Sequence, residues 1–337
     1  MQSAMSLYRS PSTASPFFRL LAFALFLTFD LIMFGAFVRV TDAGLGCPDW
    51  PGCYGKASPI GAMTQIREAA AVLPDGPVTV FKAWVEMLHR YVAAGLGLII
   101  IVLVVLAHRD ARRRASIGLA WFTLAWILLQ GAFGAWTVTL KLQPAIVTLH
   151  LLGGMVLFGL LVAQWVRIRV QEGLAVFSTG LRRLAWIACA VLFMQIALGG
   201  WVSTNYATLA CEDFPTCQGQ WWPVADFARG FQLWRPLGQT ADGAALPFQA
   251  LTAIHLTHRL WAMVAFAVLG LLAWALRTQD GRSARWLGLL LLLQLVTGLT
   301  NIFLDWPLAA AVLHTGGAAA LAGMTIMVAL RAPYRSL

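Results

Sequence analysis

Long apolar runs alternate with short polar segments along this chain, and each run has the length that a membrane-spanning helix requires. About 20 consecutive apolar residues are enough to cross the hydrocarbon core of a bilayer as an α-helix. Eight such runs occur, at residues 17–38, 86–107, 116–139, 145–166, 183–203, 253–276, 285–304 and 309–330. The pattern therefore predicts an all-α integral membrane protein with eight transmembrane helices.

The composition excludes a soluble protein. Hydrophobic residues make up 60% of the 337 residues and charged residues only 11%, whereas about 25% of an average soluble domain is charged. A soluble fold of this size cannot hide that much apolar surface, so lipid must be its solvent. The first run, residues 17–38, is long enough to span and carries no small-residue cleavage pattern. No cleavable signal peptide is therefore expected.

The basic residues indicate how the chain is oriented in the membrane. The net charge is +10, and 15 of the 24 Lys and Arg residues fall on one side of the predicted spans. They precede the first run, follow every second run and end the chain: Arg9, Arg19, Arg109, Arg112, Arg113, Arg114, Arg167, Arg169, Arg182, Arg183, Arg277, Arg282, Arg285, Arg331 and Arg335. The positive-inside rule places both termini in the cytoplasm and two long loops, about residues 39–85 and 204–252, outside. Such clusters indicate membrane orientation and not a nucleic-acid-binding face.

Two copies of one four-helix unit make up the chain. The segment FGAFVRVTDAGLGCPDWPGC, which ends at Cys53, aligns without gaps with LGGWVSTNYATLACEDFPTC, which ends at Cys217. The sequence EMLHR at residues 86–90 recurs as HLTHR at residues 255–259, after a second long loop that is slightly longer than the first. Four spans per unit give both copies the same orientation, so a pseudo-twofold axis along the membrane normal should relate the two bundles.

This repeat predicts the organisation of the chain. We expect a first four-helix unit at residues 17–166 and a second at residues 183–330, joined by a cytoplasmic linker at residues 167–182. Cytoplasmic tails at residues 1–16 and 331–337 complete the chain.

Histidines occupy matching positions in the two units. His89 and His150 in the first unit, and His258 and His314 in the second, lie near the start of helices that run inward from the outer face. At 1.5 Å per residue they are within roughly 5–10 Å of the outer helix ends. Two imidazoles at matched depth in one bundle are a usual axial pair for a membrane haem. The plainer alternative is hydrogen bonding between helices, and a zinc site is disfavoured because no third or fourth ligand accompanies each pair.

The two units differ beside these histidines. Where the second unit has His255, the first has Glu86, which shares a helix face with His89 because the two are spaced i,i+3. An acid near the membrane is either functional or simply solvated among the lipid headgroups. The difference suggests that one unit carries chemistry and the other carries electrons. Arg90 and Arg259 follow the two histidines directly and would contact either haem propionates or lipid phosphate.

Four of the five cysteines form two C-x5-C pairs in the outer loops. Cys47 with Cys53, and Cys211 with Cys217, would face the oxidising side of a bacterial membrane. Disulfides are therefore expected, with unpaired thiols as the alternative. The pair in the first unit would be either structural or redox-active, since it lies on the loop that leads to Glu86.

Other polar or small residues inside the spans allow simpler explanations. Asp30 lies near the middle of the first span, where an acid is a functional hypothesis, but pairing with a polar group such as Gln130 also explains it. Cys189 is alone in the fifth span and is expected to pack in the core. Gly134 and Gly298 are expected to permit close helix packing.

These motifs together resemble the haem A synthase family. The specific parts are VRVTDAGLGCPDWPGCYG at residues 38–55, EMLHR at residues 86–90 and the four-plus-four repeat with paired histidines. The resemblance extends over essentially the whole chain and, through Cys47 and Cys53, points to the bacterial branch that contains the cysteine pair. It implies an oxidoreductase that converts the C8 methyl group of haem O to the formyl group of haem A, for assembly of terminal oxidases.

The resemblance also implies roles for individual residues. His89 and His150 would bind the substrate haem O, and His258 and His314 would hold the iron of haem b. Glu86 matches the catalytic glutamate of the family. The implied setting is a bacterial inner membrane, with the haem sites toward the periplasmic side.

The implied partners are the haem O synthase as supplier, the lipid membrane and the terminal oxidase under assembly, with no nucleic acid. The electron donor is not indicated, and formation of a homo-oligomer is left open.

Two chemical routes fit these residues. Conversion of a methyl group to an aldehyde needs two successive oxidations and loss of water. If His89 and His150 both bind iron, either one of them leaves during turnover or electrons are withdrawn and water attacks the activated methyl group. In the second route, which we favour, Glu86 stabilises positive charge or accepts a proton from water, and haem b relays electrons.

Two other functions are compatible with parts of the pattern. A dihaem b-type cytochrome passing electrons between a quinol and an outer acceptor explains the histidines but not Glu86 in place of His255. A transporter with parallel repeats explains the symmetry but not the histidine pairs.

Overall fold

The computed structural model describes residues 15–74, 76–109, 114–171 and 173–331. In these ranges the chain is helical without strands, and eight helices are long and apolar enough to cross a membrane. They are α1 (Pro16–Val40), α3 (Val80–Arg109), α4 (Arg114–Thr139), α5 (Pro144–Gln171), α6 (Thr179–Thr204), α8 (Phe248–Leu276), α9 (Gly281–Phe303) and α10 (Leu308–Leu330). The predicted all-α membrane fold is thus confirmed. Arg9, Arg112, Arg113 and Arg335, used to predict the orientation, lie outside the described residues.

Local capping explains where several helices begin. Ser15 and Ser178 accept hydrogen bonds from the backbone at the starts of α1 and α6, and Asp280 does the same for α9. Proline occupies the first position of α1 and α5, where its missing N–H costs nothing. These signals start each of these spans within a few residues of the expected boundary.

Two helices begin earlier than the apolar pattern predicts. α3 starts at Val80 and not near residue 86, and α8 starts at Phe248 and not near residue 253. Hydropathy detects only the lipid-facing part of a helix, whereas the first turns of α3 pack beneath a polar loop. His89 consequently lies deeper in α3 than the sequence pattern suggests.

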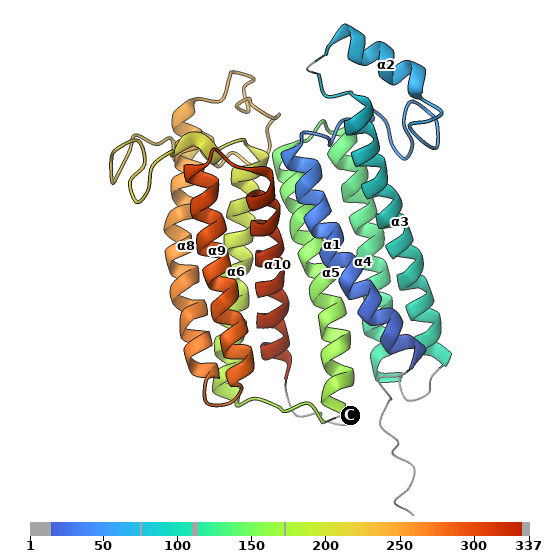
Figure 1. The fold of residues 1–337 in the computed structure, drawn as a ribbon, viewed down its shortest axis with the longest axis vertical. Coiled ribbons are helices and arrows are strands. Elements are labelled where there is room, and N and C mark those ends of the chain that lie inside the picture. The colour runs from blue at the N-terminus through green and yellow to red at the C-terminus, as the bar shows by residue number, and fades with distance from the viewer. Residues whose placement is uncertain (1–14, 75, 110–113, 172, 332–337) are drawn as a thin grey trace, which may run out of the picture.

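The same helix pairs pack together in both halves of the chain. α1 contacts α3 and α5, and α4 contacts α3 and α5; α6 contacts α8 and α10, and α9 contacts α8 and α10. α5 with α10, α1 with α10 and α5 with α6 join the two groups, which stand side by side in Figure 1. The pseudo-twofold axis itself stays a prediction.

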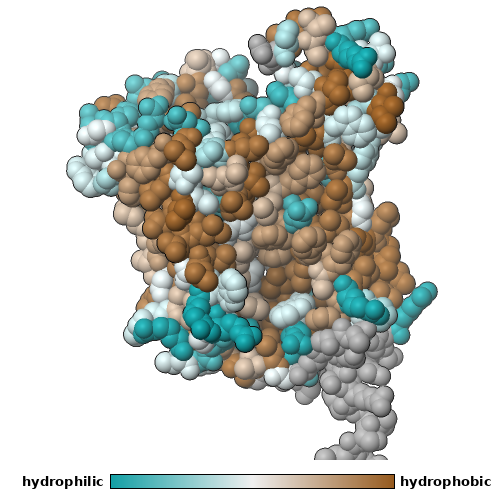
Figure 2. Space-filling view, in the orientation of Figure 1, coloured by the Kyte–Doolittle hydropathy of each residue, from teal (hydrophilic) through white to brown (hydrophobic). Residues whose placement is uncertain are grey.

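Loops with short helices cover one end of the bundle, which we call the loop end. They contain α2 (Met63–Val72), the 3-10 helix η2 (Thr208–Ala210) and α7 (Phe227–Gly230). The start of α1 and the end of α10 lie at the opposite end (Figure 1). Figure 2 shows a broad apolar band around the middle of the molecule, with hydrophilic residues gathered at both ends. This distribution fits a bilayer crossing.

Candidate functional site

Each of the four predicted ligand histidines faces a glycine on a neighbouring helix. A Cβ atom added to the glycine would lie 3.0–3.5 Å from the nearest imidazole atom, in the pairs Gly35 with His89, Gly134 with His150, Gly199 with His258 and Gly298 with His314. The glycines therefore leave room for the imidazole rings. Gly134 and Gly298 were expected to permit close helix packing, and the group that packs against each of them is a histidine ring.

The four histidines line one cavity of about 1570 Å³, together with Glu86. Ordinary pockets for small ligands measure about 300–1,000 Å³, so this cavity is large enough for bulkier ligands. Its walls are mainly apolar, as a porphyrin requires. The buried Nδ1 atom of His150 has no hydrogen-bond partner within the described part of the chain. Paired imidazoles, an apolar cavity and an unpartnered ring nitrogen all fit a haem in each unit.

A hydrogen bond with Thr297 indicates which nitrogen of His314 is available to iron. The hydroxyl group of Thr297 donates to the carbonyl of Leu293 at 2.7 Å, so its oxygen can accept from Nδ1–H of His314 at 2.9 Å. Nε2 is then the unprotonated nitrogen, which a metal can use. Phe133 stands at the matching position of the first unit, which explains why Nδ1 of His150 is unpartnered. Sequence reasoning missed this difference.

His258 also has a polar neighbour. Its Nδ1 and Nε2 atoms lie 3.2 Å and 3.4 Å from the side-chain nitrogen of Gln195 on α6. Leu31 occupies the matching position on α1. The ring of His89 instead meets the edge of Phe34, with the ring centroids 5.7 Å apart. Both histidines of the second unit therefore have side-chain hydrogen-bonding partners, whereas His89 and His150 have no such side-chain partner among the described residues.

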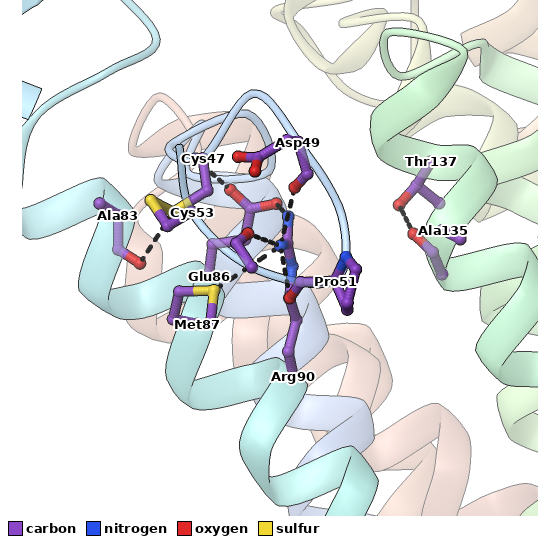
Figure 3. A network of polar contacts seen from close by, with 12 residues as sticks. Cys47, Asp49, Pro51, Cys53, Ala83, Glu86, Met87, Arg90, Ala135 and Thr137 are labelled. Carbon is purple, nitrogen blue, oxygen red and sulfur yellow. Dashed lines mark hydrogen bonds and ion pairs between the residues drawn. A yellow bond between two sulfur atoms is a disulfide. The ribbon is translucent and has the colours of Figure 1, made fainter. Parts of the chain in front are cut away.

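Glu86 is buried beneath the first disulfide loop and is not solvated among headgroups. Its side chain points from α3 toward the loop (Figure 3), and the residue is 4% exposed. One carboxylate oxygen accepts from the backbone N–H of Cys47 at 2.8 Å, and the other accepts from Arg90 at 2.5 Å. Because Glu86 also lines the cavity, it joins the disulfide loop to the site of His89 and His150.

His255 occupies the corresponding place in the second unit and ties down the corresponding loop. Its Nδ1–H donates to the carbonyl of Ala207 at 3.0 Å, while its Nε2 accepts from Arg259 at 3.1 Å. Both ring nitrogens are used in holding this loop, and His255, like Glu86, lines the cavity. The substitution of Glu86 for His255 therefore places an acid where the repeat otherwise needs only a tether.

Arg90 and Arg259 hold the disulfide loops in place. Arg90 donates to the carbonyl oxygens of Asp49, Pro51 and Gly52 at 2.9, 3.2 and 2.6 Å (Figure 3). Arg259 donates to the carbonyl oxygens of Asp213, Thr216 and Cys211 at 2.7, 2.8 and 2.6 Å. The sequence analysis expected these arginines to contact either haem propionates or lipid phosphate, and it did not predict their hydrogen bonds to the loops. Both residues also line the cavity.

Both predicted disulfides are present. The Cα atoms of Cys47 and Cys53 are 4.9 Å apart, and those of Cys211 and Cys217 are 4.7 Å apart. Unpaired thiols, the alternative, are thereby excluded for these four residues. Cys189 is a free cysteine, and its side chain is partly buried.

An aspartate shapes the turn that follows each disulfide. Asp49 accepts backbone hydrogen bonds from Tyr54 and Gly55 at 2.6 and 2.7 Å, and Asp213 does the same from Gln218 and Gly219 at 2.6 and 3.0 Å. A hydrogen bond from the hydroxyl group of Thr216, together with these backbone N–H groups, lowers the pKa of Asp213. The repeated aspartates are therefore part of the loop scaffold.

Asp30 does not pair with Gln130, contrary to the suggested alternative. The carboxylate is exposed on α1 and has no partner within the described residues. The amide of Gln130 instead lies against Gly153 on α5. Asp30 therefore takes no part in the polar contacts that organise the histidine site.

Comparison with known proteins assigns the chain. The sequence model of the COX15-CtaA family, described as cytochrome oxidase assembly protein, matches residues 18–326. The chain belongs to this family. A Heme A synthase of Shewanella oneidensis is 40% identical over 309 residues, which cover 90% of this chain and 92% of that protein.

More distant relatives carry the same name. A Heme A synthase of Caulobacter vibrioides is 27% identical over 90% of this chain and 92% of its own length. One from Halalkalibacterium halodurans is 28% identical over 58% of this chain and 61% of its own length. The resemblance found from the sequence motifs is thus confirmed.

Proposed function

We propose that this protein is a haem A synthase that oxidises the C8 methyl group of haem O to a formyl group. The family assignment supports the reaction class, and the observation that carries the site is the buried carboxylate of Glu86. Glu86 lines the same cavity as His89 and His150, at the position where the second unit has His255.

In this proposal His89 and His150 hold the substrate haem. His258 and His314 hold haem b, which would transfer electrons when bound. Thr297 keeps Nδ1 of His314 protonated and so leaves Nε2 for iron. The glycine opposite each histidine keeps the neighbouring helix clear of the imidazole edge. Arg90 and Arg259 line the cavity and would contact the haem propionates while keeping their hydrogen bonds to the loops.

The overall reaction adds one water to the methyl group and gives the aldehyde with release of four protons, two from the methyl group and two from water. The four electrons released with them pass to an external electron acceptor. Glu86 is placed to accept a proton, because Arg90 and the Cys47 N–H hold its carboxylate at the cavity wall. Arg90 also balances the charge of the carboxylate, which would otherwise be costly in this apolar surrounding. Cys47 and Cys53 act here as a structural clamp that presents the Cys47 N–H.

The proposed setting is a bacterial inner membrane, with the loop end and both haem sites toward the periplasm. Haem O synthase would supply the substrate, and a terminal oxidase would receive the product.

Substitution of Glu86 by alanine tests the assignment. The purified variant should retain haem b but form no formyl product from haem O, as judged by chromatography of the extracted haems. Glu68→Ala removes an exposed carboxylate from α2, in the same loop region, and should behave as wild type. Haem A formation by the Glu86 variant at the wild-type rate would remove Glu86 from the reaction.

The haems extracted from the wild-type protein distinguish a haem A synthase from the main alternative, a dihaem cytochrome. Haem B together with haem O or haem A is expected. Haem B alone, with no conversion of added haem O, would favour the dihaem cytochrome and refute the proposal.

A further inference from the structure

The cavity has different walls in the two units. On α3, Ala94 and Gly97 line it; at the aligned positions of α8, Met263 and Phe266 line it. The first unit therefore has two small residues where the second has two large ones.

The facing helix shows the same difference. On α4, Gly131 and Ala135 line the cavity, and at the aligned positions of α9 Leu295 and Leu299 line it. α3 packs beside α4, and α8 packs beside α9. We call the small-walled space between α3 and α4 the tail slot, defined by Ala94, Gly97, Gly131 and Ala135.

The glycines of the tail slot do not serve helix packing. Nothing lies within 4 Å of a Cβ atom built on Gly97 or Gly131. In contrast, a Cβ atom on Gly134, one turn from Gly131, would lie 3.5 Å from the imidazole of His150. The missing side chains at Gly97 and Gly131 therefore leave open space, in the same cavity that holds the buried, unpartnered Nδ1 of His150.

The tail slot reaches the lipid-facing surface. Leu98 on α3 and Leu128 on α4 line the cavity, yet they are 66% and 67% exposed. Ala94 and Gly131 are also exposed. A ligand in the first unit can therefore extend from the histidines between α3 and α4 to the bilayer.

We propose that the tail slot binds a long, flexible apolar chain attached to the substrate porphyrin and admits that substrate sideways from the membrane. The inference rests on the proposed function, since haem O differs from haem B by an isoprenoid chain. At the four aligned positions the second unit carries the larger Met263, Phe266, Leu295 and Leu299 and therefore suits a haem without such a chain. The slot makes Gly97 and Gly131 specificity-determining residues.

Exchange of residues between the units tests the proposal. Gly97→Phe and Gly131→Leu install the side chains of the second unit in the slot. Purified protein that retains haem b is titrated with haem O and, separately, with haem B, and binding at the first unit is followed by absorption. The affinity for haem O should fall roughly tenfold or more, while the affinity for haem B at the same site changes little.

A matched control and a replacement variant distinguish a specific loss of haem O binding from general damage to the fold. Gly95→Val installs the residue of the second unit (Val264) at a glycine that also has open space but does not line the cavity, and it should bind haem O normally. Retained haem b reports that each variant is folded, and Ala94→Met replaces any variant that loses haem b.

The outcomes separate this inference from the proposed function. Equal weakening of haem O and haem B, or no weakening of either, would overturn the tail slot while wild-type conversion of haem O still stands. A wild-type protein that binds haem O in the slot without converting it would overturn the function and leave the slot in place.

Discussion

Replacement of Thr297 by valine removes one hydrogen bond from a proposed iron ligand and leaves the shape of the side chain nearly unchanged. Thr297 is 5% exposed, and its oxygen accepts from Nδ1–H of His314 at 2.9 Å. Ligation through Nε2 requires that Nδ1 carry the proton. In the variant this buried N–H has no acceptor when haem is bound, whereas the free ring can change tautomer or turn.

The size of the effect follows from that unsatisfied donor. A buried donor without a partner costs about 1–3 kcal/mol, which corresponds to roughly 5- to 150-fold in affinity. Loss of a hydrogen bond to a metal-bound histidine typically weakens metal binding by about 10- to 100-fold. We therefore expect haem b to bind the Thr297→Val variant at least roughly tenfold more weakly.

The assay is the transfer of haem b from the purified protein to an excess of an apo haem-binding protein, followed by absorption. Thr300→Val is the matched control, because the hydroxyl group of Thr300 donates only to the carbonyl of Val296 on the same helix. Haem loss should be faster for Thr297→Val and unchanged for Thr300→Val. Equal rates for wild type and Thr297→Val would refute the reasoning that Thr297 orients His314.

Two further predictions concern α6 and α1. Gly199→Ala places a Cβ atom 3.0 Å from Cε1 of His258 and should lower the haem content of the second unit, measured as haem per protein chain. Gly180→Ala on the same helix, where nothing lies within 4 Å, should not; full haem occupancy in Gly199→Ala would show that the glycine is not needed. Asp30→Leu should favour membrane insertion of α1 by about 3 kcal/mol, since aspartate is unfavourable and leucine favourable at the centre of a span. Insertion efficiency of the isolated span in a translocation assay measures this, and an unchanged efficiency would indicate that Asp30 is not within the hydrocarbon region.

The sequence by itself determined the eight spans, the cysteine pairs and the histidine pairs. Hydropathy is a local property, and alignment of the two halves of the chain exposes which residues match. The comparison of Glu86 with His255 needed nothing more than this alignment. The predicted starts of α3 and α8 were less accurate, because the first turns of those helices interact with loops and not with lipid.

Only the tertiary structure decided what surrounds these residues. The carboxylate of Glu86 on α3 is hydrogen-bonded to Cys47 on a loop, and Thr297 on α9 contacts His314 on the neighbouring helix α10. The unpartnered nitrogen of His150, the tether made by His255 and the open space beside Gly97 likewise arise between helices. Residues on separate helices become neighbours through the rotation and depth of each helix, which side-chain packing sets. Hydropathy along one span carries no information on that packing, so the chemistry of the site became visible only in the folded bundle.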